Sequence, residues 1–429
     1  MANIMEYLDW RGDVPFSIDP FNEVDNLILS EIAYTDLEGI MGSKDEMPLT
    51  DVCKKYFSVH TVEEVSSRDT FYRLAPMVMK KAAESVRFHD FVLSEYINII
   101  DADKEEQMSA LTFTVPGYMT YVAFRGTDNT IVGWKEDFNL SYMEETPGQK
   151  RAVRYLNEQY KRKDEKLYVG GHSKGGNFAV YAGAFCDDEI REKIVTIYTN
   201  DGPGFREDIL NTVEYQRILP HVMSIIPNES LVGILLMGTF THTVIKSSAH
   251  AIAQHDPLTW QVYGNSFVGS DLSGGSILMD KTVSAWLSEL DDSKRQRFID
   301  VLFDMLTATG ASTLEEMSGS GIKGLSEGMK LLKGLPKDEQ NEFLNMLKKL
   351  FKTGGGYLLL GIMEGTENLV NGAIEGAAKI RDRIMESKVK AEVPRIEAGG
   401  PEYGNGINGE DSENESSGNT DVESDKEIV

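Results

Sequence analysis

The residues of this sequence that are best placed to do chemistry lie in the stretch YVGGHSKGGNFA, residues 168–179. Here Gly171, Ser173 and Gly175 reproduce the spacing G-x-S-x-G. This spacing is typical of a tight turn between a strand and a helix, in which glycines make room for a serine hydroxyl that stands above the sheet. A β-rich run precedes the stretch and a small-residue run follows it, as such a turn requires. We therefore predict that Ser173 is a nucleophile, with a structural glycine-rich turn as the alternative.

A phosphate-binding loop is a second interpretation of so many glycines. Such a loop carries a lysine that is followed directly by serine or threonine, so that the lysine reaches the phosphates and the hydroxyl holds magnesium. In this sequence Ser173 precedes Lys174, and two glycines follow the lysine. The order of the residues therefore excludes a phosphate-binding loop.

A serine hydroxyl is a poor nucleophile until a base removes its proton, and the base needs an acid that orients it. In this architecture the three residues follow one another in the order serine, acid, histidine. We predict that His255 is the base, because it lies in a polar loop directly before a predicted strand, where it can reach over the strand ends. His250, in the same loop, is the alternative base. A surface position without a catalytic role is the second interpretation of both histidines.

Asp201 is the predicted acid. It follows the apolar strand candidate TIYTN and precedes a Gly-Pro-Gly turn. Ligand sites of open α/β sheets lie at the carboxyl ends of the strands, and this position puts the Asp201 carboxylate there. Glu229 holds the equivalent position after the next strand candidate and is the alternative acid. A turn or a helix cap is the alternative role for Asp201.

The elements that must position these residues divide into four parts. Residues 1–90 carry apolar residues three or four apart, which predicts a helical N-terminal preface. In residues 91–275 short β-rich runs alternate with helical patterns, which predicts an α/β core with a mostly parallel sheet flanked by helices. Residues 276–397 contain long helical patterns without β-rich runs, which predicts a helical C-terminal region. Residues 398–429 are rich in Gly, Asn, Ser and acidic residues and predict a disordered acidic tail.

The composition limits the classes of partner and the location. The formal net charge of −26 repels nucleic acid and anionic headgroups, so neither is expected as a partner of the whole chain. The amino terminus lacks the basic start and continuous apolar run of a signal peptide, and we find no apolar run long enough to cross a bilayer. The two cysteines, Cys53 and Cys186, provide neither a disulfide framework nor a metal-ligand spacing. We therefore expect a cytoplasmic protein.

Several stretches together resemble a known family. Residues 121–142, YVAFRGTDNTIVGWKEDFNLSY, resemble the part of class 3 lipases in which a Phe-Arg-Gly-Thr motif ends a strand and contributes to the oxyanion hole. Residues 170–183 resemble the turn that carries the lipase nucleophile. The whole set is similar to a bacterial Mbeg-like family of unknown function assigned to the α/β-hydrolases, over roughly residues 5–310. The set also includes MEYLDWRGDVPF, NDGPGF and QHDPLTW.

This resemblance implies an α/β-hydrolase fold of the lipase-like kind, with Ser173 as nucleophile and with Thr127 and Lys174 flanking the oxyanion hole. Two backbone amides aimed at a developing oxyanion lower the barrier to acyl transfer. The chain departs from class 3 lipases in two places. Residues 230–233, Ser-Leu-Val-Gly, stand where their acid segment would lie, so the acid is expected at Asp201, as in pancreatic-type lipases. Lys174 stands where lipases often carry leucine, which disfavours an oily acyl site.

Three residues near the Phe-Arg-Gly-Thr motif have expected structural roles. We expect Arg125 and Asp137 to form an ion pair that fixes the oxyanion loop, in preference to a catalytic role for either. Trp134 is expected either to line the pocket or to cover the core.

Taken together, these residues favour a serine hydrolase of the lipase or esterase type, which cleaves a small-molecule acyl ester or thioester through an acyl-enzyme. No metal or organic cofactor is needed, because the chain supplies nucleophile, base and oxyanion donors itself. One alternative is a catalytically silent scaffold with this fold. Another is a peripheral membrane protein, which the acidic composition disfavours because interfacial helices usually carry Lys and Arg on their polar face. The sequence does not indicate an oligomeric state.

Overall fold

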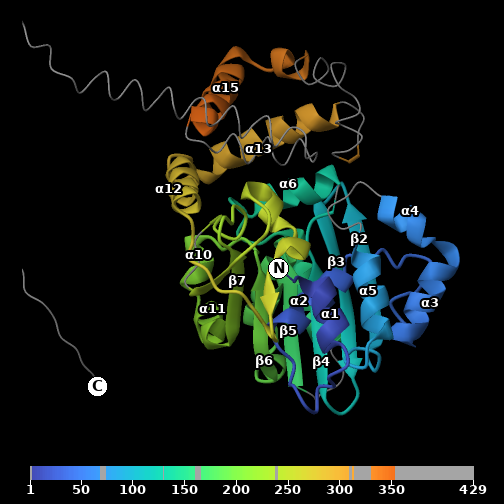
Figure 1. Ribbon diagram of the computed structural model, residues 1–429. Coiled ribbons are helices and arrows are strands. Elements are labelled where there is room, and N and C mark those ends of the chain that lie inside the picture. The colour runs from blue at the N-terminus through green and yellow to red at the C-terminus, as the bar shows by residue number, and fades with distance from the viewer. Residues whose placement is uncertain are drawn as a thin grey trace, which may run out of the picture. The chain divides into compact units, whose positions relative to one another are not determined.

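The computed structural model describes residues 2–67, 74–128, 130–159, 166–236, 240–308, 312–313 and 330–352 (Figure 1). Contacts divide the chain into residues 1–374 and 375–429, and the second unit lies wholly outside the described residues. The predicted acidic tail, 398–429, and the part of the predicted helical region beyond residue 352 therefore remain predictions.

Eight strands form one sheet in which each strand pairs with the strand before it in the sequence. The pairings from β1 to β4 are antiparallel, and those from β4 to β8 are parallel. The predicted fold class, an α/β fold with a mostly parallel sheet flanked by helices, is confirmed. The strands are β1 (Glu46–Pro48), β2 (Val92–Asp101), β3 (Glu106–Val115), β4 (Met119–Arg125), β5 (Lys166–His172), β6 (Ile194–Asn200), β7 (Val222–Pro227) and β8 (His242–Ile245).

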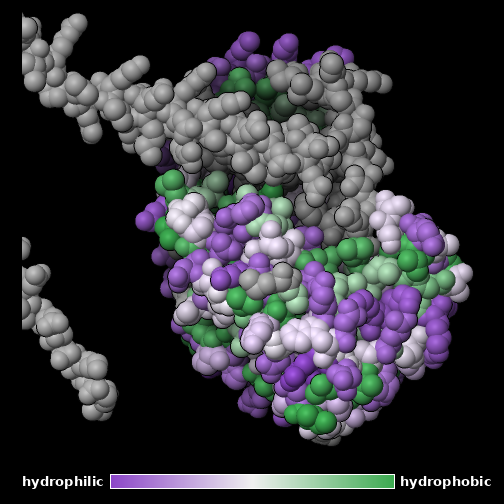
Figure 2. Space-filling view, viewed as in Figure 1, coloured by the Kyte–Doolittle hydropathy of each residue, from purple (hydrophilic) through white to green (hydrophobic). Residues whose placement is uncertain are grey.

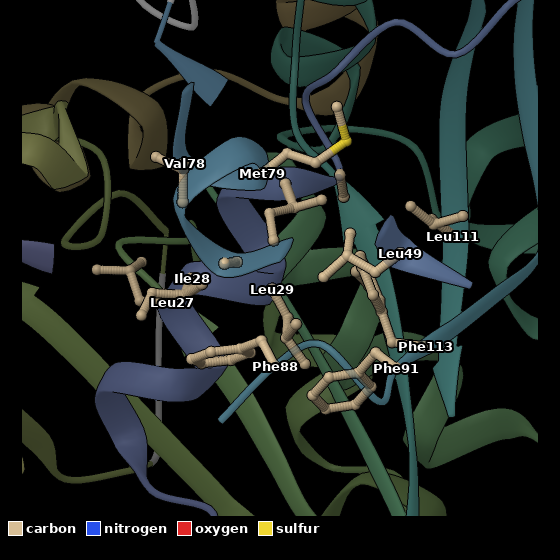
Figure 3. Packing of buried hydrophobic residues seen from close by; sticks show 14 of the residues in the cluster. Leu27, Ile28, Leu29, Leu49, Val78, Met79, Phe88, Phe91, Leu111 and Phe113 are labelled. Carbon is tan, nitrogen blue, oxygen red and sulfur yellow. The ribbon is translucent and has the colours of Figure 1, made fainter. Parts of the chain in front are cut away.

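One face of the sheet is covered by helices from the first 90 residues. Nine of the ten residues of α2 are buried, and its apolar side chains face the sheet and the neighbouring helices. Figure 3 shows Leu29 of α2 beside Phe88 and Phe91 in this cluster. The short strand β1 also lies within these residues, and the helical patterns did not predict it. The helices are α1 (Ile4–Arg11), α2 (Glu23–Ile32), α3 (Leu49–Val59), α4 (Val62–Ser67) and α5 (Ala75–Glu84).

The opposite face is covered by helices that alternate with the parallel strands. The small residues of α8 let this helix approach the sheet closely, as its sequence predicts: a Cβ atom at Gly183 would lie 2.5 Å from the Ile197 side chain. Apolar residues of α7, α8 and α11 form a second core with β4, β5 and β6. These helices are α7 (Pro147–Gln159), α8 (Lys174–Phe185), α9 (Asp188–Arg191), α10 (Glu207–Leu210) and α11 (Val213–Ile218).

After β8 the chain makes short turns rather than long elements. The strand predicted directly after His255 is present only as Val262–Tyr263, one strand of a two-stranded ribbon that is separate from the main sheet. The fully buried Trp260 donates its Nε1 hydrogen bond to the Gln254 carbonyl at 2.8 Å, which fixes the turn that ends at His255. The elements are η1 (Leu219–His221), which precedes β7, and then η2 (Ala251–His255), η3 (Pro257–Thr259), β9 (Val262–Tyr263) and β10 (Ser266–Phe267).

Helix α13 (Asp292–Thr307), from the C-terminal part of the chain, packs on α6 (Ile131–Asn139), the helix that follows the Phe-Arg-Gly-Thr motif (Figure 1). A third apolar cluster joins Ile131, Trp134 and Phe138 of α6 to Phe298 and Phe303. Trp134 therefore packs against the C-terminal helices. These helices are α12 (Gly274–Ser288), α13 (Asp292–Thr307) and α15 (Lys337–Lys352).

The surface in view mixes polar and apolar residues. On the coloured part of the face in Figure 2, hydrophobic residues are interspersed among hydrophilic ones. Across the described ranges, none of the helices combines the length and the apolar character needed to cross a membrane.

We expect Phe298→Ala to lower the free energy of unfolding by about 3–5 kcal/mol, because it removes a buried aromatic ring and leaves a cavity. Urea unfolding measures this loss, and hydrogen exchange should show faster exchange of the α6 amides. Leu278→Ala, at an exposed position of α12, is the matched control and should change the free energy by less than about 0.5 kcal/mol. Equal stability of the two variants would contradict a role of α13 in holding α6.

Candidate active site

Ser173 lies in the turn between β5 and α8, in a backbone conformation that serine rarely adopts. Its φ is 58° and its ψ is −135°. Two glycines make the turn possible: a Cβ atom at Gly175 would lie 2.0 Å from the Phe124 carbonyl oxygen, and one at Gly171 would lie 2.4 Å from the same atom. A non-glycine residue held at positive φ costs about 1–3 kcal/mol, and such strain is concentrated at functional sites. The strand, turn and helix predicted around Ser173 are all present.

Asn200, the last residue of the neighbouring strand β6, forms hydrogen bonds that hold this turn in place. Its carbonyl accepts a hydrogen bond from the Ser173 N–H at 2.9 Å, and its side chain donates to the Gly171 carbonyl at 3.1 Å. The Asn26 amide of α2 donates to the Asn200 side-chain oxygen at 2.9 Å. Asn26 of the N-terminal helical layer therefore helps to hold the turn that carries Ser173.

Asp201 and His255 meet at the carboxyl end of β6. The distance from His255 Nδ1 to Asp201 Oδ2 is 2.6 Å. The carboxylate also accepts hydrogen bonds from the Ser230 hydroxyl and, at 3.0 Å, from the Gly233 N–H. Because an ionised carboxylate only accepts hydrogen bonds, Nδ1 carries the imidazole proton and Nε2 is left to act as a base. Asp201 is fully buried and has a φ of 49°, a second strained residue of the site.

His172, which directly precedes Ser173, contacts the turn that carries His255. The two rings contact each other with centroids 4.5 Å apart and planes tilted by 35°, and His172 Nε2 donates to the His255 carbonyl at 2.9 Å. Burial, and secondarily the nearby His255, lower the pKa of His172 well below its usual value, so this ring is neutral at neutral pH. Its Nδ1 lies 3.1 Å from the Tyr34 hydroxyl, which also accepts a hydrogen bond from the Gly126 N–H. One buried chain of contacts thus joins the base, the nucleophile turn and the loop after β4.

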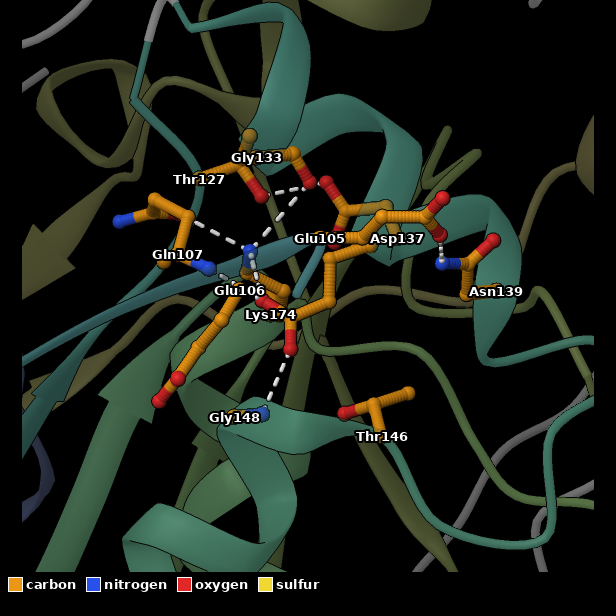
Figure 4. A network of polar contacts seen from close by, with 12 residues as sticks. Glu105, Glu106, Gln107, Thr127, Gly133, Asp137, Asn139, Thr146, Gly148 and Lys174 are labelled. Carbon is orange, nitrogen blue, oxygen red and sulfur yellow. Dashed lines mark hydrogen bonds and ion pairs between the residues drawn. The ribbon is translucent and has the colours of Figure 1, made fainter. Parts of the chain in front are cut away.

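Gly126 brings the loop after β4 against Ser173. A Cβ atom at Gly126 would lie 2.9 Å from the Ser173 Cβ atom and 2.6 Å from the His172 carbonyl oxygen, so only glycine fits there. The next residue, Thr127, donates its hydroxyl hydrogen bond to the Asp137 carboxylate of α6 (Figure 4). Lys174 is the first residue of α8, and the first N–H groups of a helix have no partner within it. Thr127 thus follows the glycine that touches Ser173, and Lys174 follows Ser173 directly. The role of both residues in an oxyanion hole remains a prediction.

The expected ion pair between Arg125 and Asp137 is not formed. Arg125 bonds to Asp128 at 3.1 Å and to the Asn98 side chain at 2.9 Å, because Asp128 is close to it in the same loop. Asp137 instead accepts the Thr127 hydroxyl. Desolvation raises the pKa of Asp137 to about 6, although the charge of Lys174 and the Thr127 hydrogen bond act in the opposite direction.

Ser173 Oγ has no hydrogen-bond partner among the residues that the structure describes. The nucleophile and the imidazole are therefore not bonded to each other here. Hydrogen bonds of catalytic groups are often long or poorly aligned before substrate binds. The His255 side chain keeps 15% of its surface exposed, which leaves the ring accessible.

A sequence model of the Mbeg1-like family matches residues 82–304, more than half of the chain. The chain belongs to the Mbeg1-like family. The match includes Ser173, Asp201 and His255, and it bears out the resemblance that the motifs indicate. It begins after the stretch MEYLDWRGDVPF.

Among solved structures, this Mbeg1-like chain is similar to M37 lipase, with 16% identity and a TM-score of 0.30 over 49% of this chain and 68% of that chain. It is also similar to the lipase from Rhizopus microsporus var. chinensis, with 14% identity and a TM-score of 0.28 over 56% of this chain and 86% of that chain. No curated protein matches the sequence.

The alternative acid and the alternative base of this Mbeg1-like chain lie together, away from the contact of Asp201 with His255. His250 is 83% exposed, and its Nδ1 lies 3.5 Å from the Glu229 carboxylate. Glu229 also accepts the Ala251 N–H at 2.8 Å, which supports the start of η2. Glu229 therefore helps to shape the turn that carries His255.

Two further residues of the site were not found by sequence reasoning. Tyr34 and His172 connect the loop after β4 to the turn of His255, but Tyr34 lies far from both in the sequence. The only local signal was the position of His172 inside G-x-S-x-G. Within the described parts of the chain, no group of three His, Cys, Asp or Glu residues is arranged to hold a metal ion.

We expect Asp137→Asn to gain stability relative to the wild type as the pH rises from about 4 to about 6. The native protein keeps the Asp137 proton up to about pH 6, whereas the unfolded chain releases it near the ordinary value of 3.8. The stability that the protonated Asp137 carboxyl contributes is thus fully present below pH 3.8 and is lost as the pH rises through about 6. A shift of about two units corresponds to about 3 kcal/mol, and because Asp137 is partly exposed we expect about 1–2 kcal/mol.

Urea unfolding of both proteins at pH 4, 5, 6 and 7 measures this difference. A difference in unfolding free energy that stays constant over this range would show that Asp137 titrates as an ordinary aspartate.

Proposed function

We propose that this chain is a serine hydrolase of the lipase or esterase type, which cleaves an ester or thioester through Ser173, His255 and Asp201. The observation that carries the proposal is the contact of 2.6 Å between the buried Asp201 carboxylate and His255 Nδ1, next to a nucleophile turn with φ of 58°. Strain at both Ser173 and Asp201 supports it, because strained backbone is retained where the surrounding structure requires it. Membership of the Mbeg1-like family is compatible with the proposal and does not specify a reaction.

In the proposed reaction, Ser173 Oγ attacks the acyl carbonyl while His255 Nε2 takes the hydroxyl proton. The tetrahedral oxyanion accepts hydrogen bonds from the backbone N–H groups of Thr127 and Lys174. Asp201 stabilises the imidazolium ring by its contact with Nδ1. The imidazolium then gives its proton to the departing alcohol or thiol, and the acyl-enzyme remains. Water, deprotonated by the same imidazole, attacks the acyl-enzyme. The bond to Ser173 Oγ then breaks, the imidazolium returns its proton to Ser173 Oγ, and the acid is released.

Because Ser173 Oγ is bonded to none of the residues that the structure describes, the proposed reaction requires the serine and the imidazole to approach each other when substrate binds. Rotation of the Ser173 side chain to another rotamer is the simplest change of this kind. The position of the Ser173 hydroxyl is also compatible with a catalytically silent scaffold, in which the serine and the imidazole never approach each other. These two possibilities are distinguished by the reactivity of Ser173.

We also propose a small-molecule acyl ester as the partner and the cytoplasm as the location. Both cysteines of the sequence, Cys53 and Cys186, are free and buried, which suits a reducing compartment. The net charge of −26 disfavours nucleic acid as a partner.

We expect the purified wild type to be labelled by a fluorophosphonate probe at Ser173, and Ser173→Ala to remain unlabelled. Asp201→Asn should slow labelling on the order of 10³- to 10⁴-fold, because the amide no longer fixes the required tautomer of His255. Intact-protein mass spectrometry follows the reaction, and circular dichroism confirms that each variant is folded.

Glu229→Gln is the matched variant for the acid, since it makes the same change at the alternative carboxylate. Labelling that depends on Glu229 and not on Asp201 would show that the acid is assigned wrongly. A folded wild type that is never labelled would favour the silent scaffold. A panel of p-nitrophenyl esters of increasing acyl length then measures the size of the acyl site.

A further inference from the structure

The side chain of Lys174 is buried beside the nucleophile turn and does not reach solvent. Its Nζ donates to Gln107 Oε1 at 2.8 Å, to Glu136 Oε2 at 3.1 Å and to the Gly133 carbonyl at 3.3 Å (Figure 4). Neither the lysine nor the glutamate side chain has any exposed surface. Lys174 and Glu136 therefore form a fully buried ion pair directly after Ser173 in the sequence.

The Glu136 carboxylate collects contacts from several elements. Besides Lys174 of α8, it accepts the Gln107 N–H of β3 at 2.9 Å and the Gly148 N–H of α7 at 2.7 Å. Glu136 itself belongs to α6, and the next residue, Asp137, holds the Thr127 hydroxyl. A single carboxylate thus sets the position of α6 relative to the first turn of α8.

The free energy of folding alone does not explain why the chain retains this buried ion pair. A buried pair of charges loses its hydration, and replacing it with apolar residues of similar volume is often neutral or stabilising. A positive charge at the N-terminal end of a helix also opposes the helix dipole. A buried ion pair does, however, hold its partners at fixed distances and directions, because breaking it leaves an uncompensated charge in the interior.

We propose that the ion pair of Lys174 and Glu136 positions the two sides of the oxyanion hole relative to each other. Lys174 ties α8, and with it its own backbone N–H, to α6. Through Asp137, α6 holds the loop that carries Thr127. Lys174 and Glu136 act as positioning residues in this proposal, since neither side chain is assigned a contact with substrate. The inference rests on the proposed function, because an oxyanion hole has a role only if acyl transfer occurs.

The experiment compares Glu136→Gln with Asp25→Asn. Asp25 forms an ion pair with Arg87 in the N-terminal helical layer, and both side chains of that pair are also fully buried. Each variant replaces the carboxylate of a buried ion pair by its amide, so the two report on the same chemical change inside and outside the site. Hydrolysis of p-nitrophenyl acetate gives kcat and KM, and Ser173→Ala gives the background rate.

We expect Glu136→Gln to lower kcat about 10- to 100-fold with KM changed less than about twofold, because a displaced donor weakens binding of the transition state more than that of the substrate. Asp25→Asn should keep kcat within about twofold of the wild type. An equal loss of kcat in both variants would overturn the inference, since it would reflect destabilisation in general.

If Glu136→Gln does not fold, the double variant Glu136→Gln/Lys174→Met replaces it, because it leaves no unpaired charge in the interior. A folded double variant with the kcat of the wild type overturns the positioning role and leaves the proposed hydrolase intact. A wild type that neither hydrolyses the ester nor reacts with fluorophosphonate overturns the proposed function, and the inference with it.

Discussion

The candidate site depends on the close contact between the nucleophile turn and the end of β4. The backbone at Gly171 and Gly175 comes so near the Phe124 carbonyl that no side chain fits between them. This contact forces the chain to leave β5 through a left-handed residue and directs the first turn of α8. It also brings the residues after Phe124 beside Ser173, since Gly126 lies against the same turn. The spacing of glycines in two separate motifs therefore has a single physical cause.

The residues that could be predicted from the sequence are those whose position follows from strand order and local turns. Ser173 was predicted because its flanking glycines are close in the sequence, and Asp201 because it follows an apolar strand. His255 was predicted because it lies in a polar loop directly before a predicted strand. The structure brings Asp201 and His255 into contact, whereas His250 is exposed to solvent beside Glu229. The alternating strands and helices likewise predicted the sheet, although not the short β1.

Buried polar contacts between distant segments could not be predicted in the same way. Tyr34 reaches His172 across 138 positions, and a single sequence contains no periodic signal for such a pair. In the sequence, Glu136 does not differ from a polar residue of a surface helix. The structure shows that α13 covers α6 and that the buried Lys174 side chain bonds to Glu136. The expected partner of Arg125 was wrong because a closer carboxylate, Asp128, competes successfully within the same loop.

The strand order of the sheet has a consequence for how the protein is made. Each strand pairs with the strand before it, so a chain that emerges from the ribosome can add strands one at a time to an existing edge. β5 and the nucleophile turn are synthesised before β7, β8 and the turn that carries His255. A nascent chain thus contains Ser173 long before it contains the imidazole. In the proposed reaction such a chain lacks the base that activates Ser173, so the site is completed only after β8 and the turn that carries His255 have been made.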